Sequence, residues 1–469
     1  MKKKVLLIHP KNESNDVVYP LGCLYLSAFL LRGGFEPILF DHNDRKDYRG
    51  FIQEHLSDLV CVGISAITGS QVKYGLEIAT YIRKRDNKMP IVWGGRHATS
   101  LPEITLQDSR VDIVVRGEGE ETFLELVNAF HNRSNLNLIK GISYKVNGQI
   151  YHNRDREPLD LSTMPPIPWQ LIDIEKKLVD STIRSISIQT GRDCPFSCTY
   201  CSHKKTTIEK YRGFSPDYIL NSIEPLIQKH AITYVNFYEP HFISHPKRVE
   251  EICKTIVNRR LKIHWSASAR ANTFVKFEHK LLELLKKSGC DRIGFGFESG
   301  SKKILKKIDK RIKPVQVIES VELCKTYHII PECCFMVGFP FETILDTIKT
   351  LAIISKIKRI FSAIIVHMQG YTPFPNTILY DACKRYKLIE PTNLEWWGEY
   401  SNIKKNTTWL SPISKIFIKL LSATIFVSDY SYLKKRKDIR LLIVPYVIVN
   451  LFFTSIYCFS SVFLKKELE

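Results

Sequence analysis

The sequence is poor in the features that mark secreted, disordered or repetitive proteins. It has only 12 cysteines in 469 residues, too few for a disulfide scaffold. The N-terminus, Met1 to Lys4, leads straight into a short apolar stretch and lacks the form of a signal peptide. No internal repeat is found, and 44% hydrophobic with 25% charged residues excludes a disordered or collagen-like chain. We therefore expect a cytoplasmic protein of two or three domains, since one domain usually takes about 150 residues.

The sequence has fewer acidic than basic residues. It contains 48 Asp and Glu residues and 68 Lys and Arg residues, which gives a net charge of +20. This balance favours anionic neighbours such as nucleic acid, a phospholipid surface or a phosphorylated substrate, without choosing among them.

The first 130 residues alternate between short β-branched runs and longer helical patterns such as Leu21–Leu31 and Val72–Arg85. This alternation predicts a parallel, doubly wound sheet, whose ligands bind at the carboxyl ends of the strands. Small and polar residues follow three of the strands, at Ser65–Gly69, Gly94–His97 and Gly117–Glu120. The predicted strands are Val5–His9, Pro37–Phe40, Leu59–Ile64, Ile91–Trp93 and Ile113–Val115.

A second alternation begins at Ser185. Before it, Ile142–Val146 and Ile150–His152 flank Asn147-Gly148, which predicts a hairpin, and the proline-rich Met164–Trp169 predicts a linker. Six strand–helix units then fit a complete or partial barrel. Its predicted strands are Ser185–Gln189, Tyr234–Phe237, Ile263–Ala267, Arg292–Phe297, Cys333–Val337 and Ala363–His367.

The strongest chemical signal is a C-x3-C-x2-C group formed by Cys194, Cys198 and Cys201, directly after a predicted strand. Three thiolates this close can bind three irons of a 4Fe-4S cube and leave the fourth iron open to a substrate. The alternative is a zinc knuckle, but zinc needs a fourth ligand at a suitable spacing, and His203 is too close.

This group after the first barrel strand, with Tyr200 before its last cysteine, resembles the radical S-adenosylmethionine (SAM) superfamily. The resemblance covers nearly the whole chain. It implies that the open iron chelates the amino and carboxylate groups of SAM. An electron from the cluster then splits SAM into methionine and a 5′-deoxyadenosyl radical.

Later strand ends agree with this resemblance. Gly294–Ser301 and Gly338–Thr343 are similar to the motifs after the fourth and fifth strands, although Phe341 stands where glycine is commoner. Asn376, after the sixth strand, is a similar departure. Each segment taken alone also reads as a turn or helix cap. The SAM contacts that the resemblance implies are Tyr200, Glu239, Arg270, Glu298, Ser299 and Gly338.

The N-terminal sheet resembles the cobalamin-binding domain of cobalamin-dependent radical SAM enzymes. The Asp-x-His-x-x-Gly signature is absent, because Asp41-His42 lacks the intervening residue, so bound cobalamin would have no histidine ligand. Two alternatives are a domain that has lost the cofactor, and a helix-capping role for Glu118 and Glu120. The implied cobalamin contacts are Ser65, Thr68, Gly94, Gly95, His97, Gly117, Glu118 and Gly119.

The C-terminal region is basic and apolar. Residues 404–469 carry 11 Lys and Arg but 4 Asp and Glu, and Leu441–Leu464 has no charge over 24 residues. As a helix this run is ~36 Å long, enough to cross a bilayer. Because Lys434–Lys437 precedes it, we expect contact with the inner face of the cell membrane. Three arrangements of Leu441–Leu464 fit the pattern: a helix that spans the membrane, a helix that lies in its interface, or an apolar core helix.

These observations predict four parts: a cobalamin-binding domain (1–135), a hairpin and linker (136–175), a radical SAM barrel (176–400) and a helical extension (401–469). The favoured reaction is methylation of an unactivated carbon of a small or lipid-like metabolite, with an external electron donor such as flavodoxin or ferredoxin. The alternatives are oxidative cyclisation, carbon-skeleton rearrangement and RNA methylthiotransfer. The last usually needs a second cysteine group, whereas Cys23 and Cys61 are isolated, so no nucleic acid is expected. A non-enzymatic iron–sulfur sensor would need neither the Glu298 nor the Gly338 segment.

Overall fold

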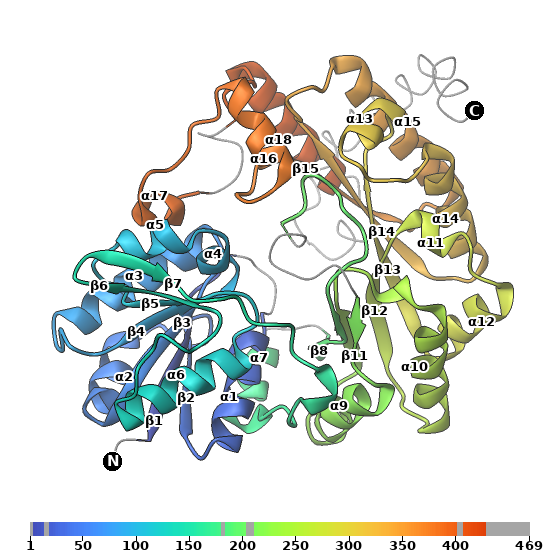
Figure 1. Ribbon diagram of the computed structural model, residues 1–469. Coiled ribbons are helices and arrows are strands. Elements are labelled where there is room, and N and C mark those ends of the chain that lie inside the picture. The colour runs from blue at the N-terminus through green and yellow to red at the C-terminus, as the bar shows by residue number, and fades with distance from the viewer. Residues whose placement is uncertain (1–2, 14–17, 180–182, 203–210, 401–406, 428–469) are drawn as a thin grey trace.

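A computed structural model gives the structure of residues 3–13, 18–179, 183–202, 211–400 and 407–427. The chain forms two main sheets, built mostly of parallel strands, each with helices packed against it (Figure 1). The first sheet occupies the N-terminal third of the chain, and the second follows the linker. Both alternations expected from the sequence are confirmed.

The first sheet contains five parallel strands in the order β2-β1-β3-β4-β5, as a doubly wound fold requires. The strands are β1 (Lys4–His9), β2 (Glu36–Asp41), β3 (Leu59–Ser65), β4 (Ile91–Gly94) and β5 (Ile113–Val115). The helices between and after them are α1 (Leu21–Arg32), α2 (Tyr48–His55), α3 (Ser70–Arg83), α4 (Gly95–Ser100), α5 (Pro102–Gln107) and α6 (Glu120–Asn132).

The predicted hairpin extends this sheet instead of standing apart with the linker. Strands β6 (Ile142–Val146) and β7 (Gln149–His152) add antiparallel to β5, giving seven strands. The turn residues Asn147 and Gly148 have φ values of 51° and 82°, which fits the expected turn with two left-handed residues. The linker continues through α7 (Ile174–Leu178).

The second sheet has six parallel strands in the order β15-β14-β13-β12-β11-β8. Because β8 and β15 lie at opposite edges of that order, the barrel is partial. Its strands are β8 (Ser185–Gln189), β11 (Tyr234–Tyr238), β12 (His264–Ala269), β13 (Cys290–Glu298), β14 (Ile330–Val337) and β15 (Ile365–Gly370), with a short β9/β10 pair (Gly191–Arg192, Arg212–Gly213) beside β8. The helices of this part are α9 (Pro216–His230), α10 (Pro246–Asn258), α11 (Ala271–Phe274), α12 (His279–Lys287), α13 (Lys302–Lys307), α14 (Pro314–Thr326), α15 (Ile344–Ile360) and α16 (Ile378–Cys383).

Burial alternates along the barrel strands. In β14, Cys333, Phe335 and Val337 are buried, while Glu332, Cys334 and Met336, which alternate with them, are only partly buried. Successive side chains point to opposite faces of a strand, so the buried set packs under the helices and the partly buried set faces the barrel interior.

After the barrel the chain returns to the first sheet. Helix α17 (Leu394–Gly398) packs against α3, and the Gly69 amide donates to the Trp397 carbonyl at 3.1 Å (Figure 1). Near the linker, the Tyr19 hydroxyl donates to the Ser185 carbonyl at 2.8 Å. The two sheets are thus joined on two sides, which fixes the space between them.

The last described element is α18 (Pro412–Val427), which packs on β15. Within the described ranges, no helix is long and apolar enough to cross a membrane. The predicted membrane segment Leu441–Leu464 and the basic run before it lie outside the described residues.

Candidate active site

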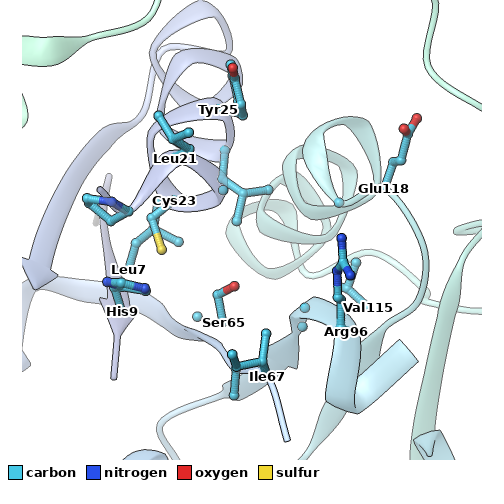
Figure 2. Close-up of a pocket in the computed structure, with 18 of the residues that line it drawn as sticks. Leu7, His9, Leu21, Cys23, Tyr25, Ser65, Ile67, Arg96, Val115 and Glu118 are labelled. Atoms are coloured by element: carbon cyan, nitrogen blue, oxygen red, sulfur yellow. The ribbon is translucent and has the colours of Figure 1, made fainter. Parts of the chain in front are cut away.

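A cavity of about 640 Å³ lies between the carboxyl ends of β1, β3, β4 and β5 and the first strands of the barrel. Figure 2 shows side chains from several of these strand ends around it, among them His9, Ser65 and Arg96. The barrel contributes Gln189, Arg192 and other residues from its first strands. Six of the predicted cobalamin contacts line this cavity: Ser65, Gly94, Gly95, Gly117, Glu118 and Gly119.

Glycine is required at the rim of this cavity. Gly95 has a φ of +85°, and a Cβ there would lie 2.7 Å from the Ala66 carbonyl oxygen. Gly117 has a φ of +74°, a conformation that side-chain-bearing residues rarely adopt. The bare backbone at these strand ends lets a large flat macrocycle approach closely. This cradle fits the corrin ring of cobalamin.

Thr68 and His97 lie beneath the rim and are not among the residues that line the cavity. The Thr68 hydroxyl and His97 Nδ1 are 2.9 Å apart, and the His97 ring packs on Trp397. Burial lowers the pKa of His97 to about 3, so the imidazole is neutral. In this structure the two residues support the loops that line the cavity, with Trp397 of α17 behind them.

Glu118 and Glu120 join the first sheet to the barrel. Glu118 accepts hydrogen bonds from Arg212 at 2.6 and 3.0 Å and lies 3.1 Å from Arg192. Glu120 pairs with Arg192. Burial opposes ionisation of Glu118, but Arg212 and Arg192 outweigh it and lower the pKa of the carboxyl. Glu118, predicted as a cobalamin contact or a helix cap, and Glu120, predicted as a helix cap, thus hold the strand that leads into the cysteine loop.

The cysteine loop begins one residue after Arg192. Asp193, with a φ of +70°, turns the chain, and Arg212 holds its carboxylate at 2.6 and 2.8 Å. The Arg270 guanidinium donates to Cys198 Sγ at 3.2 Å. Burial raises the pKa of Cys194, against the effect of nearby Arg270. A cation beside the sulfurs suits the thiolates that an iron–sulfur cluster needs.

Among the described residues, no three Cys, His, Asp or Glu side chains converge on a single point. A 4Fe-4S cube does not require convergence, because each thiolate binds a different iron. The loop is anchored at its middle, where the Thr199 amide donates to the Ile308 carbonyl at 3.0 Å and the Ser197 hydroxyl donates to Asp309 at 2.9 Å. A C-x3-C-x2-C loop wrapped in this way fits the cluster.

Three polar side chains meet beside the cluster loop. The Tyr200 hydroxyl donates to Glu298 Oε1 at 2.8 Å, and Lys310 Nζ donates to the same oxygen at 2.7 Å. Glu298, at the end of β13, has a φ of +66°, and such strained residues cluster at functional sites. Lys310 was not predicted, because nothing in its local sequence distinguishes it from the other lysines. The group places a paired cation and carboxylate beside the cluster loop.

Three other predicted SAM contacts have partners within the protein. The Glu239 carboxylate accepts from Thr190 at 2.7 Å and from Tyr211 at 3.1 Å. Ser299 Oγ lies 3.0 Å from Thr350 Oγ1. The Gly338 amide donates to Glu342 at 2.6 Å, and its carbonyl accepts from Trp409 at 3.0 Å. The structure therefore brings Tyr200, Arg270 and Glu298 to the cluster loop. Glu239, Ser299 and Gly338 instead stabilise the framework around it.

His241 is a neighbour of the cluster loop that the motifs did not identify. Its ring packs on Phe196 of the loop, and its Nε2 lies 3.3 Å from Thr273 Oγ1. Burial, with Arg270 nearby, lowers its pKa to about 3. It is a neutral hydrogen-bonding group beside the cysteines.

Comparison with known proteins agrees with this architecture. Residues 188–354 match the Radical SAM superfamily, and residues 11–127 match the B12 binding domain. An uncharacterized methyltransferase of Pyrococcus horikoshii is 30% identical over 416 residues, 85% of this chain and 86% of that protein. The anaerobic magnesium-protoporphyrin IX monomethyl ester cyclase of Rubrivivax gelatinosus is 28% identical, over 80% of this chain and 69% of that protein.

Solved structures share the fold. The cobalamin-dependent SAM radical enzyme OxsB, with aqua-cobalamin and SAM bound, superposes with a TM-score of 0.78 at 20% identity, covering 97% of this chain and 72% of that chain. The radical SAM methyltransferase TsrM from Kitasatospora setae gives 0.71 at 18% identity, covering 82% and 76%. With the motifs, the two domain matches and the Pyrococcus relative, the chain belongs to the radical SAM enzymes that carry a B12-binding domain, whose cofactors are a 4Fe-4S cluster, SAM and cobalamin.

Proposed function

We propose that this enzyme methylates an unactivated carbon of a small-molecule substrate. The observation that carries the proposal is that one cavity has the glycine rim of the first sheet on one side and the strand leading to Cys194 on the other. When bound, the cluster and SAM supply hydrogen-abstracting radical chemistry, and cobalamin supplies a transferable methyl group. Asp193, directly before Cys194, lines the cavity, so a substrate bound at this end would lie next to the start of the cluster loop.

The chain's own residues bind, orient and shield these groups. Lys310, Glu298 and Tyr200 would hold the charged end of SAM, and Arg270 holds Cys198 in place. The Arg192 ion pairs keep the cluster loop at a fixed position against the cobalamin side. A fixed distance between substrate and methyl donor matters, because a substrate radical would otherwise react with another group first.

The test uses anaerobically reconstituted full-length enzyme, a reductant, a metabolite extract and SAM with a trideuterated methyl group. We expect 5′-deoxyadenosine together with a product in which a trideuteromethyl group replaces a hydrogen. The control is the same enzyme reconstituted without cobalamin, which should form no labelled product. Formation of 5′-deoxyadenosine without label transfer would contradict methylation and favour cyclisation or rearrangement.

Two alternatives draw on weaker support. Cyclisation is supported by the cyclase relatives alone. Methylthiotransfer would need further sulfur ligands near the first sheet, and burial raises the pKa of both Cys23, to about 12, and Cys61. Such buried neutral thiols are poor cluster ligands. A flavodoxin- or ferredoxin-like electron donor is also part of the proposal. So is a division of the chain near residues 175 and 400, whereas the hairpin after residue 135 belongs to the first sheet.

We also propose that α18 lies on an anionic phospholipid surface. Ile413, Ile416, Phe417 and Leu420 form an exposed apolar stripe at helical spacing, while Ile418 and Leu421 are buried against the protein. The sequence beyond α18 continues into a basic run and then an uncharged apolar run, a combination that favours anionic lipid. A lipid-like substrate would then be delivered from the membrane.

A further inference from the structure

A buried chain of polar groups runs from the linker to the floor of the cobalamin cavity. Lys177 of α7 has a side chain only 1% exposed and donates to Asp41 Oδ2 at 2.7 Å. It also donates to Asp44 at 3.0 Å and to the Val18 carbonyl at 2.9 Å. Asp41 is also buried, and its other oxygen lies 3.1 Å from His9 Nδ1. His9, at the end of β1, lines the cavity (Figure 2).

The backbone fixes the orientation of the next member, Gln71. Its Oε1 accepts from the Ile67 amide at 3.0 Å, and its Nε2 donates to the Pro10 carbonyl at 3.2 Å. Because an amide N–H only donates and a carbonyl only accepts, the side-chain amide cannot be turned over. Gln71 Nε2 therefore also donates to His9 Nε2, which lies 3.1 Å away.

This orientation determines the tautomer of His9. Its Nε2 accepts, so the proton of the neutral ring is on Nδ1 and is donated to Asp41. Asn43 Nδ2 lies 3.3 Å from His9 Nδ1 and donates to the same Asp41 oxygen at 2.8 Å, which is consistent with this assignment. Both ring nitrogens of His9 are thus used within the protein.

An imidazole at the floor of a cobalamin cavity is in a place to coordinate cobalt, and it needs a free lone pair to do so. Resting on the proposed binding of cobalamin in this cavity, we propose that Gln71 is a positioning residue that keeps His9 from becoming a cobalt ligand. Asp41, held in place by Lys177, accepts the proton of the other ring nitrogen, Nδ1, and so acts only through His9. Cys23, which also lines the cavity, is a buried neutral thiol and offers no replacement ligand.

The test is the electron paramagnetic resonance spectrum of the reconstituted full-length enzyme with cob(II)alamin bound. A nitrogen ligand splits each cobalt line into a triplet, which a merely structural change does not produce. We expect no nitrogen splitting in the wild type, and splitting in Gln71→Ala that disappears in the His9→Phe/Gln71→Ala double variant. Gln71→Glu is the matched control: its carboxylate accepts from the Ile67 amide and from a proton on His9 Nε2, although it loses the bond to the Pro10 carbonyl. A protonated Nε2 has no free lone pair, so this variant should show no splitting.

Two results would overturn the proposal. One is nitrogen splitting in the wild type that His9→Phe removes, and the other is a folded Gln71→Ala enzyme without splitting. A second measurement does not depend on the cofactor: the nitrogen resonances of His9 in the full chain labelled with 15N-histidine, assigned with His9→Phe. Protonation at Nδ1 supports the proposal, and protonation at Nε2 contradicts it. If the wild type takes up no cobalamin, the proposed function fails while this measurement still judges the hydrogen-bond network.

Discussion

Arg192, just before the cluster loop, and Glu120, at the start of α6, form an ion pair that joins the barrel to the first sheet. Both side chains are more than nine-tenths buried. The two residues are 72 positions apart, and Glu118 lies 3.1 Å from the same guanidinium. A loop that carries the radical-generating cluster is therefore attached directly to the part of the chain that lines the cobalamin cavity.

Loss of Glu120 should destabilise the enzyme, because Arg192 would keep a buried charge with one partner removed. We expect Glu120→Ala to lower the free energy of unfolding by about 3 kcal/mol. Glu121→Ala is the matched control, since Glu121 pairs with Arg156 at a more exposed position and should cost about 1 kcal/mol or less. Urea unfolding followed by circular dichroism measures both. If both variants lower the free energy of unfolding by the same amount, the buried Arg192–Glu120 pair stabilises the enzyme no more than an exposed pair does.

The three loop cysteines should be necessary for the cluster, and other cysteines should not. Cys194→Ala, Cys198→Ala and Cys201→Ala should each lose the cluster and reductive SAM cleavage, while the reconstituted wild type binds about four irons per chain. Cys334→Ala, a partly buried thiol outside the loop, should keep both. Iron analysis and chromatographic detection of 5′-deoxyadenosine provide the measurement. SAM cleavage retained in any of the three loop variants is incompatible with the assignment.

Lys310 should contribute to SAM binding. Lys310→Met removes the cation from Glu298 and leaves a buried carboxylate beside the cluster loop. A charge-assisted hydrogen bond is worth about 1.5–3 kcal/mol. We therefore expect the Kd for SAM to rise roughly ten- to a hundredfold. Lys306→Met, exposed one turn earlier, should leave the Kd unchanged. Equilibrium dialysis with labelled SAM distinguishes the two, and unchanged affinity in Lys310→Met would remove Lys310 from the site.

The stabilisation that comes from Asp41 should depend on pH. Burial favours the neutral carboxyl, but the hydrogen bond to His9 and the charge of Lys177 outweigh it and hold the pKa of Asp41 well below its usual range. The folded-state pKa is lowered, so the stabilisation is complete above the unfolded value of about 4 and is lost as pH falls below it. Asp41→Asn should be less stable than the wild type at neutral pH, and the difference should shrink in acid. A difference that stays constant down to the acid transition would contradict this pKa.

The apolar stripe of α18 should be needed for membrane binding. We expect the full-length enzyme to sediment with vesicles containing phosphatidylglycerol, and the Ile416→Glu/Leu420→Glu variant to bind them more weakly. Leu138→Glu, an exposed apolar residue in the first sheet's region, serves as control. If the α18 variant instead changes the sedimentation coefficient without vesicles and leaves vesicle binding intact, the stripe is a contact between two copies. If the variant binds vesicles as the wild type does and its sedimentation coefficient is unchanged, the α18 stripe is not the membrane-binding surface. Leu441–Leu464 or another part of the chain then binds the vesicles.

Local patterns in the sequence were enough to predict the two alternating sheets, the hairpin turn and the cysteine loop. Strand runs and helix starts are set by neighbouring residues, and the three cysteines lie within eight positions, so their proximity needs no tertiary information. The glycine rim also follows from position, because Gly94 and Gly95 lie at the end of β4 and Gly117 follows β5 by two residues.

Only the tertiary structure decided which polar side chains meet. Lys177 and Asp41 are 136 residues apart and pair because the fold places Lys177 of α7 beside the last residue of β2. Nothing near either residue in the sequence indicates the partner. For the same reason His97 was predicted as a cofactor contact but lies under the rim, whereas His9 lines the cavity. A buried charge or imidazole must find a partner wherever packing places it, and that place is a property of the folded chain as a whole.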